Sequence, residues 1–486
     1  MTLFEKMGFK ENPFSKFSAE EEVAYLEKIY VPPKYISTIL NDIEGNNSRF
    51  IFGERGNGKS ALMFDLIDSL REKKALVIMI DDYQFLMSSG NHLILRYLRE
   101  ISEKLIKEIT REMILKEIKI SSFEIVEREK LAFLIKNFFR TSSKKEFENF
   151  GGLTPSEKAY NVAFANILNR LIGGAVTITS DLISKAFGLP VIEEKNIYRE
   201  YLPLIKKTTS EIDFTKITEN ELFNLLGDAL EIANLIGFKN IVFFFDKVDE
   251  EREIAGKIKE ETDILEPILL SNKILLDRRY SMTFLLWSKL KSEIENRGVR
   301  LDKIGHVNVN WNNTEILEII EKRISYFSDG SASFIKLFQS PDDVDLILSL
   351  ANKSPRDLII LMNKIYTQQE QINPNLGLFS RISVNQGINE FLIHYNFKAK
   401  YPTQEGSKQD IRTTILRLKK IGKSDFKIKD ISNVYKIEDN KSRNYARIMK
   451  NLGVVSEKED TLGTEKEYVI CDPKIKFVVE KGLDLS

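Results

Sequence analysis

One short stretch, residues 51–60, constrains this chain more than any other. It reads Ile-Phe-Gly-Glu-Arg-Gly-Asn-Gly-Lys-Ser, and from Gly53 to Ser60 it matches the complete phosphate-loop pattern G-x-x-x-x-G-K-[ST]. The glycines, among them Gly56 and Gly58, let the backbone curl tightly around an anion. The alternative is a chance match in a glycine-containing turn.

The residues around the motif favour the functional interpretation. The apolar run 50–52 predicts a strand before the loop, and 61–67 predicts a helix after it. Backbone amides at the start of that helix, including that of Ala61, face a β-phosphate, where the helix dipole also favours negative charge. Lys59 can reach the β- and γ-phosphates, and the Ser60 hydroxyl can ligate Mg²⁺. The motif therefore predicts a site for ATP and Mg²⁺.

Composition sets wider bounds. The 486 residues suit two to four domains, and 42% apolar residues suffice for large cores. Lys+Arg and Asp+Glu both number 72, so a nucleic-acid site would have to be a local patch. The single cysteine, Cys471, excludes an internal disulfide. No run approaches a membrane-spanning length and the N-terminus lacks a signal-peptide layout, so we expect a cytoplasmic protein without membrane contact.

Five apolar runs alternate with helical patterns along the chain. They lie at 49–52, 75–80, 241–245, 282–287 and 306–310, and the last alternates as an edge strand does. This order predicts an α/β fold with a five-stranded parallel sheet covered by helices on both faces. We expect a P-loop ATPase domain over 49–310, an N-terminal segment over 1–48, and a helical lid over 311–400.

A helical insertion is expected inside the ATPase domain. The second and third strands are separated by 160 residues, more than a compact crossover needs. The intervening residues, about 85–235, have helical patterns at 93–118, 123–139, 157–172 and 177–187. They contain no chemical motif, and partner binding and plain helical packing both stay open.

The N-terminal segment holds a candidate wall for the nucleotide base. A helix is expected over 20–29, and 30–35 is expected to be extended because proline restricts the residue before it. Segments just before a phosphate loop often form one side of the adenine site, which makes Tyr30 and Pro32 candidates for adenine contact. Surface packing is an equal alternative for both residues.

The third predicted strand ends in carboxylates. Nucleotide-bound Mg²⁺ needs a carboxylate at a strand tip beside the phosphate loop, and Asp246 fits that role. Hydrolysis also needs a group that orients or deprotonates water. Asp249 and Glu250 are the catalytic candidates, and Glu250 is preferred. For Glu250 the alternative is a solvated charge.

At these residues the chain resembles the P-loop ATPases of the AAA+ and STAND groups. Asp246-x-x-Asp249-Glu250 is similar to the D-G-x-D-E box of NACHT-type STAND proteins, with Lys247 where glycine is usual. In initiator-type AAA+ proteins a glutamate directly follows the Mg²⁺ aspartate. The resemblance, with Lys247 at that position, implies a slow ATPase of STAND-like character.

The resemblance implies roles for further polar residues. Ser288, at the end of the fourth strand, looks like a sensor-1 residue that contacts the γ-phosphate or the attacking water. Arg356, in Ser-Pro-Arg-Asp-Leu at a helix start, looks like a sensor-2 arginine aimed at the γ-phosphate. The alternative for Arg356 is a surface arginine beside a helix cap. Arg297 and Arg300 could supply an arginine finger to a neighbouring subunit or be ordinary surface charges.

The C-terminal residues, 405–486, resemble a winged helix-turn-helix. Helical patterns at 411–418, 426–431 and 442–452 precede a hairpin pattern at 454–455 and 468–470. Residues 409–450 carry 8 Lys and 4 Arg against 5 acidic residues, a net charge of +7. On the third helix Lys441, Arg443 and Arg447, with Asn444 and Lys450, avoid the apolar stripe and could meet double-stranded DNA. Contact with this chain's own ATPase domain or another protein is the alternative.

Two functions lead. The first is an ATP-driven switch that controls homo-oligomerisation or a separate effector protein; the stretch 12–33 also looks like bacterial P-loop ATPases, some of them encoded near anti-phage defence genes. The second is a DNA-binding initiator- or loader-like ATPase that grips duplex through the winged helix. A binding module with a structural ATP site is a third reading, and a kinase is a weaker fourth.

Overall fold

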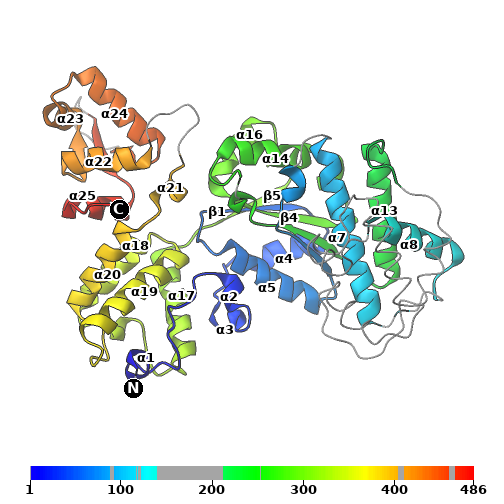
Figure 1. Ribbon diagram of the computed structural model, residues 1–486, viewed down its shortest axis with the longest axis horizontal. Coiled ribbons are helices and arrows are strands. Elements are labelled where there is room, and N and C mark those ends of the chain that lie inside the picture. Colours follow the sequence, from blue (N-terminus) through cyan, green and yellow to red (C-terminus); the bar gives the residue numbers. More distant parts are fainter. Residues whose placement is uncertain are drawn as a thin grey trace, which may run out of the picture.

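The structure of the protein is a computed structural model that describes residues 2–87, 92–116, 118, 122–138, 212–251, 253–402, 410–458 and 466–485. Its centre is a sheet of five parallel strands in the order β2-β3-β4-β1-β5 (Figure 1). The strands are β1 (Arg49–Gly53), β2 (Leu76–Ile80), β3 (Ile241–Phe245), β4 (Ser281–Trp287) and β5 (Gly305–Val309). The predicted five-stranded α/β fold is confirmed, and β5 lies at an edge of the sheet as predicted.

Alternate residues of each strand serve opposite faces of the sheet. On one face Ile51 packs with α4 (Ile36–Glu44) and α5 (Lys59–Glu72). On the other face Phe50 and Phe52 join a core with α7 (Leu93–Leu115), α13 (Glu219–Leu235) and α14 (Ile258–Leu270). Strands that are buried on both faces read as continuous apolar runs, which explains the sequence pattern.

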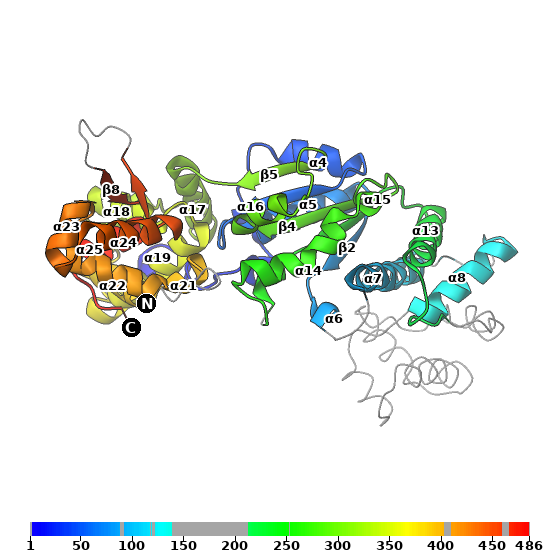
Figure 2. The same cartoon turned by 90° about the horizontal axis from the view of Figure 1, so that it is seen from above.

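Part of the helical insertion is described. The predicted helices over 93–118 and 123–139 correspond to α7 and to α8 (Ile125–Phe138), and both lie with α13 beyond the β2 edge of the sheet (Figure 2). The helices predicted over 157–172 and 177–187 fall outside the described residues. Short elements complete this half: α6 (Gln84–Met87), α15 (Asn272–Leu275), α16 (Lys291–Asn296) and the 3-10 turns η2 (Val248–Glu250) and η3 (Ser288–Leu290).

The N-terminal segment departs from its predicted form. The helix expected over 20–29 is two single turns, α2 (Ala19–Glu22) and α3 (Leu26–Ile29), preceded by α1 (Leu3–Lys6). The break falls at Tyr25, whose ring stacks on Tyr326 with centroids 5.4 Å apart. Packing on a distant helix therefore overrides the local helical pattern.

Five helices and a 3-10 turn follow the sheet in the region predicted as a helical lid. They are α17 (Asn313–Phe327), η4 (Ile335–Leu337), α18 (Pro341–Ala351), α19 (Pro355–Ile372), α20 (Arg381–Ile393) and α21 (Phe397–Lys400). Helices α19 and α20 approach so closely at Gly387 that an added Cβ would lie 2.5 Å from the Ile365 Cα. The N-terminus returns to this bundle, where Lys6 Nζ donates to the Pro374 carbonyl at 3.0 Å (Figure 1).

The C-terminal module sits against the lid helices (Figure 1). It contains α22 (Ile411–Ile421), β6 (Asp425–Lys427), α23 (Ile428–Tyr435), α24 (Asp439–Asn451), β7 (Val455–Glu457), β8 (Glu467–Ile470) and α25 (Pro473–Lys481). The three strands form an antiparallel sheet in the order β6-β8-β7. Phe426 belongs to β6 rather than to the helix expected there, because its ring stacks on Tyr468 of β8 at 5.8 Å. Sequence reasoning missed α25 altogether.

Within the described parts of the chain, no helix combines the length and apolar character that crossing a membrane requires.

Candidate functional site: the phosphate loop and its pocket

The phosphate loop joins β1 to α5 through backbone that only glycine adopts easily. Gly56 and Gly58 have φ values of +83° and +84°, and α5 begins immediately afterwards at Lys59. These left-handed positions turn the chain so that α5 begins beside the loop, with its first N–H groups free of helical partners. The loop thus has the form that binds an anion at a helix N-terminus.

Lys59 is buried within this loop. Its Nζ donates to the Gly53 carbonyl at 3.0 Å, so the side chain folds back over the curled backbone. Burial lowers the pKa of Lys59, while Asp249 and Asp246 oppose that shift. A cation held in a poorly hydrated loop attracts a phosphate more strongly than one in bulk water does.

Ser60 and Asp246 meet across the gap between α5 and β3. The Ser60 hydroxyl donates to Asp246 Oδ2 at 2.9 Å, and Asp246 is buried. Burial raises the pKa of Asp246, and the Ser60 hydrogen bond and the Lys59 charge oppose that rise. A hydroxyl and a carboxylate are the hard oxygen ligands that suit Mg²⁺, so this pair fits the metal that the sequence predicts.

Lys247 occupies a conformation that favours glycine. Its φ is +65°, in the left-handed region, at the position where the similar box of STAND proteins has glycine. Its Nζ pairs with Glu20 Oε1 of α2 at 2.8 Å. Lys247 therefore ties the end of β3 to the N-terminal segment.

The two catalytic candidates after β3 have different surroundings. Asp249 is buried and accepts a hydrogen bond from Arg55 Nε at 2.8 Å, while the Arg55 guanidinium lies 4.7 Å from the centre of the Trp287 ring. Glu250 is exposed and lines the pocket. Glu250 is therefore the more accessible carboxylate of the two.

A second residue of the loop engages the end of β4. Glu54 accepts from the Ser288 hydroxyl at 2.6 Å and from Trp287 Nε1 at 3.1 Å. Ser288, the sensor-1 candidate, thus lies beside the phosphate loop with its hydroxyl directed at a carboxylate. No signal in the sequence linked Glu54 to Ser288.

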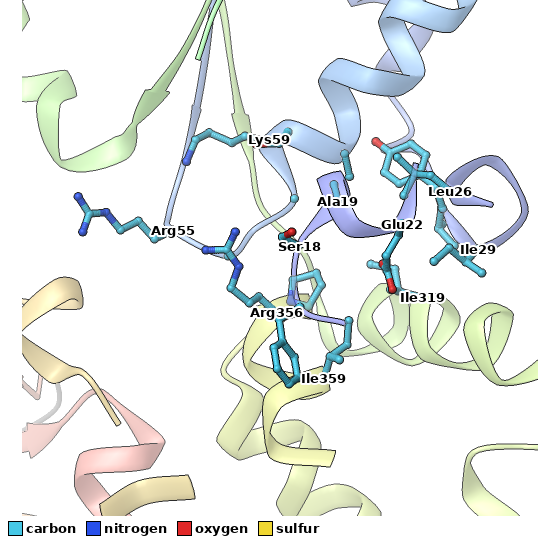
Figure 3. Close-up of a pocket in the computed structure, with 18 of the residues that line it drawn as sticks. Ser18, Ala19, Glu22, Leu26, Ile29, Arg55, Lys59, Ile319, Arg356 and Ile359 are labelled. Carbon is cyan, nitrogen blue, oxygen red and sulfur yellow. The ribbon is translucent and has the colours of Figure 1, made fainter. Parts of the chain in front are cut away.

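The lid reaches the loop through the first turn of α19. The Arg356 N–H donates to the Gly56 carbonyl at 3.3 Å, and an added Cβ at Gly56 would lie 2.8 Å from Ser354 Oγ. Arg356 lines the same pocket as Lys59, and Figure 3 shows it reaching from α19 toward the loop. The sensor-2 candidate is therefore at the phosphate loop, at the start of its helix.

The other end of the pocket is apolar. Leu26, Ile29 and Ile319 lie on the side of the pocket away from Lys59 (Figure 3). The lining also includes the apolar or aromatic side chains of Phe17, Tyr30, Val31 and Ile359. Tyr30 is thus in the pocket wall, whereas Pro32 is not among the lining residues. In the described part of the chain the buried Tyr30 hydroxyl has no hydrogen-bond partner.

A buried ion pair borders this apolar end, and sequence reasoning missed it. Arg323 of α17 donates to both carboxylate oxygens of Glu22, one of them at 3.0 Å, and to the Pro13 carbonyl. The Arg323 and Glu22 side chains are only 4% and 7% exposed. They join the N-terminal segment to α17 across 301 residues of sequence.

Glu261 of α14 is a further buried carboxyl near the site. It is wholly buried and accepts from the Gly256 N–H at 2.7 Å. Burial and the Asp249 charge raise the pKa of Glu261 to about 7. Glu261 is one of four acidic residues of α14, with Glu260, Asp263 and Glu266, and nothing in the sequence distinguishes it as the buried one.

The two arginine-finger candidates have partners within this chain. Arg297 bonds Glu266 at 2.7 Å, Glu293 at 3.0 Å and also Asp263. Arg300 pairs with Asp302 at 2.6 Å. Arg297 therefore lies in an acidic cluster on α14 and α16 rather than projecting from the surface.

The basic face of α24 is exposed as expected from the sequence. Lys441, Arg443, Asn444, Arg447 and Lys450 are all exposed, whereas Ala446 and Met449 are buried. Arg447 donates to Asn444 at 2.8 Å and Lys450 pairs with Glu457 at 3.1 Å.

No protein-family model and no curated protein matches the chain. Among solved structures it is similar to the ORC2 protein of Aeropyrum pernix in ADPNP and ADP complexes, at 12% identity and a TM-score of 0.41, covering 97% of this chain and 98% of that one. It is also similar to Drosophila ORC bound to DNA, at 9% identity and a TM-score of 0.32, covering 98% and 90%. A RuvB mutant of Thermogota maritima matches at 12% identity and a TM-score of 0.23, covering 54% and 84%. At these values the likenesses carry no argument about function.

Proposed function

We propose that the chain is a P-loop ATPase of the AAA+/STAND kind, a switch that binds and slowly hydrolyses ATP. The observation that carries the proposal is one pocket lined by Lys59 and Ser60 from the sheet domain and by Arg356 from the lid. ATP differs from ADP by its γ-phosphate. A pocket whose cations come from two parts of the molecule responds to that group by drawing the parts together.

Ser60 and Asp246 are the residues that would hold Mg²⁺. Their oxygens already lie 2.9 Å apart at the start of α5 and the end of β3. When bound, the ion neutralises charge on the phosphate oxygens. Its charge would also stabilise the ionised form of Asp246, whose burial otherwise disfavours it.

Glu250 is the preferred group for orienting or deprotonating the attacking water. It lines the pocket and is exposed, whereas the Asp249 carboxylate accepts from Arg55 and the Ser288 hydroxyl is directed at Glu54. These two engagements support slow turnover, because Asp249 and Ser288 must leave their partners before they can act on ATP.

Radiolabelled ATP turnover tests this assignment. We expect Glu250→Gln to bind ATP as the wild type does and to hydrolyse it roughly 100-fold more slowly, the size of a general-base contribution. Glu253→Gln, on the exposed turn that follows, is the matched control and should keep wild-type turnover. Equal rates in Glu250→Gln and wild type would remove Glu250 from the mechanism.

The output that we propose is a change of oligomeric state or of affinity for an effector protein. Sizing the protein with ATP, with ADP and without nucleotide tests this step. An ATP-dependent shift in mass supports a homo-oligomer, and an unchanged mass leaves the effector as the output. A role in bacterial anti-phage defence rests on the resemblance of residues 12–33 alone, and the genomic neighbours of the gene test it.

The second candidate is a DNA-binding initiator- or loader-like ATPase. It is supported by the exposed basic face of α24, a helix of 13 residues in a module of helices and a small antiparallel sheet. A winged helix uses such a helix to read the major groove of a duplex. The side chains that would meet phosphates or base edges are those of Lys441, Arg443 and Arg447.

Duplex binding at several salt concentrations separates the two candidates. Reversing Lys441, Arg443 and Arg447 to Glu should weaken binding strongly and reduce the salt slope that remains measurable at low salt by roughly 3, about 0.9 per lost phosphate contact. The control reverses three exposed lysines elsewhere, Lys10, Lys257 and Lys336, for the same change in net charge. No duplex binding by the wild type at low salt would exclude this second function.

A further inference from the structure

A cluster of charged and phenolic side chains joins the first turn of α19 to α25. Lys474 Nζ of α25 lies 2.8 Å from Asp357 Oδ2 of α19, and the Tyr395 hydroxyl donates to the same oxygen at 2.8 Å. Asp472, which caps α25, accepts from the Tyr401 hydroxyl at 2.8 Å. Lys400 Nζ lies 3.1 Å from that carboxylate. The cluster holds two cations and two anions.

The cluster is buried, so each charged group in it depends on its partner. The Lys474 side chain is 0% exposed and that of Asp472 is 1% exposed. A charge removed from water is tolerated only when an opposite charge or hydrogen bonds replace the lost hydration. Asp357 is the carboxylate that lies against Lys474, and the Tyr395 ring faces the same Nζ at 4.9 Å. Lys474 therefore fixes where Asp357 lies.

Asp357 follows Arg356 directly in the sequence, so fixing one constrains the other. Ser354 caps the helix by accepting from the Asp357 N–H at 3.2 Å, and the Arg356 N–H donates to the phosphate-loop carbonyl of Gly56 at 3.3 Å. The first turn of α19 is thus held on two sides, by the phosphate loop and by the buried cluster. Arg356 reaches toward the loop from this turn (Figure 3).

We propose that Lys474 is a positioning residue for the nucleotide site. By holding Asp357 it sets the start of α19, and through it the direction in which Arg356 meets the γ-phosphate. The C-terminal module thereby contributes to the discrimination of ATP from ADP. Because coupling between sites is reciprocal, the bound nucleotide also biases the packing of α25 on the lid. This inference rests on the proposed role of Arg356.

The test compares the affinity of each variant for ATP and for ADP. Lys474→Met removes the charge and keeps most of the side-chain length. We expect it to reduce the ATP-over-ADP affinity ratio about tenfold, with ADP affinity changed less than twofold. Lys400→Met is the matched control, because it removes the other cation of the cluster without touching Asp357, and should change the ratio less than twofold.

A double variant tells whether Lys474 acts by positioning Arg356 or whether its loss merely loosens the structure. In an Arg356→Ala background, Lys474→Met should change the ratio no further, because the residue through which Lys474 acts is absent. An equal loss in that background overturns the proposal, and so does an unchanged ratio in Lys474→Met. Tyr395→Phe removes one hydroxyl and should lower the ratio in the same direction by a smaller factor. If Lys474→Met does not fold, this variant decides, and an unchanged ratio in it overturns the proposal.

Failure of the inference is distinguishable from failure of the proposed function. If the wild type binds no ATP, or Arg356→Ala keeps the ATP preference, the nucleotide-sensing role itself fails. If Arg356→Ala loses the preference and Lys474→Met and Tyr395→Phe keep it, only the positioning role of Lys474 fails.

Discussion

The two ends of the pocket differ in the kind of groups that line them. The phosphate end consists of backbone amides and buried charged groups, with Lys59, Ser60 and Asp246 at its centre. The base end consists of apolar side chains, closed by one buried ion pair between Glu22 and Arg323. Residues of one continuous motif make most of the first end, whereas the second exists only when the N-terminal segment lies against the lid.

The largest effect is expected on nucleotide affinity, when Lys59 at the phosphate end is replaced. Lys59→Ala removes the buried ammonium of the loop and with it the charge-assisted hydrogen bonds to the phosphates. We expect ATP and ADP affinity to fall by roughly 100-fold or more. Lys73→Ala, at the exposed end of the same helix, is the control for calorimetric titration. Retained binding in Lys59→Ala would undermine the assignment of the whole site.

The next largest effect is a loss of stability when the ion pair at the apolar end of the pocket is broken. Glu22→Gln leaves the Arg323 charge buried without its counter-ion, so the free energy of unfolding should fall by roughly 3–5 kcal/mol. The double variant Glu22→Leu with Arg323→Met should recover most of that loss, because it leaves no uncompensated charge. Urea unfolding measures both, with the exposed Glu27→Gln as control. A wild-type midpoint for Glu22→Gln would show that the pair does not hold the segment.

A third effect is a pH dependence of stability that arises at Glu261 of α14. The pKa of Glu261 is raised to about 7 in the folded protein, above its unfolded value of 4.5, so the folded state holds the extra proton between these pH values. Stability should therefore fall as pH rises from about 4.5 to about 7, by about 3 kcal/mol, and then level off. Glu261→Gln should remove this part of the pH dependence of the melting temperature. An identical slope in both proteins would contradict the assignment.

The smallest changes in stability and nucleotide affinity are expected for a variant of Tyr30 that keeps the ring and removes only the hydroxyl. Tyr30→Phe removes a buried hydroxyl that has no partner among the described residues. Stability should stay the same or rise by up to about 1 kcal/mol, and nucleotide affinity should change less than twofold. A tenfold loss of affinity would mean instead that the hydroxyl meets the base.

The sequence predicted the phosphate end because its geometry is local. A loop of eight residues carries its own turn chemistry, and an apolar strand that ends in Asp246 marks that carboxylate as a strand-tip residue, although its place beside Ser60 depends on how the strands assemble. The five strands were readable for the same reason, since burial on both faces leaves an uninterrupted apolar run. Their order was not, because β1 lies between β4 and β5, which come more than 200 residues later.

The apolar end of the pocket and the buried cluster around Lys474 could not be predicted from the sequence. Glu22 and Arg323 are 301 residues apart, and neither differs by itself from a surface charge. Lys474 sits in the short helix α25, where lysines interrupt the apolar positions Ile475, Val478 and Val479, so neither the helix nor its buried cation stood out. The break at Tyr25 likewise came from a ring on a distant helix. In each case the partner, and not the residue itself, decides the structure.

The position of the first thirty residues has a consequence for how the protein is made. Arg323 holds Glu22 and Pro13, and the Lys10 N–H donates to the Phe327 carbonyl at 2.9 Å. At roughly 5–20 residues per second of synthesis, the partners of this segment emerge about 15–60 s after it does. During that time β1 also lacks both of its neighbouring strands. The phosphate loop, although it is encoded near the start of the chain, therefore lacks the strands beside β1 and the partners of the N-terminal segment until residues 281–327 have been made.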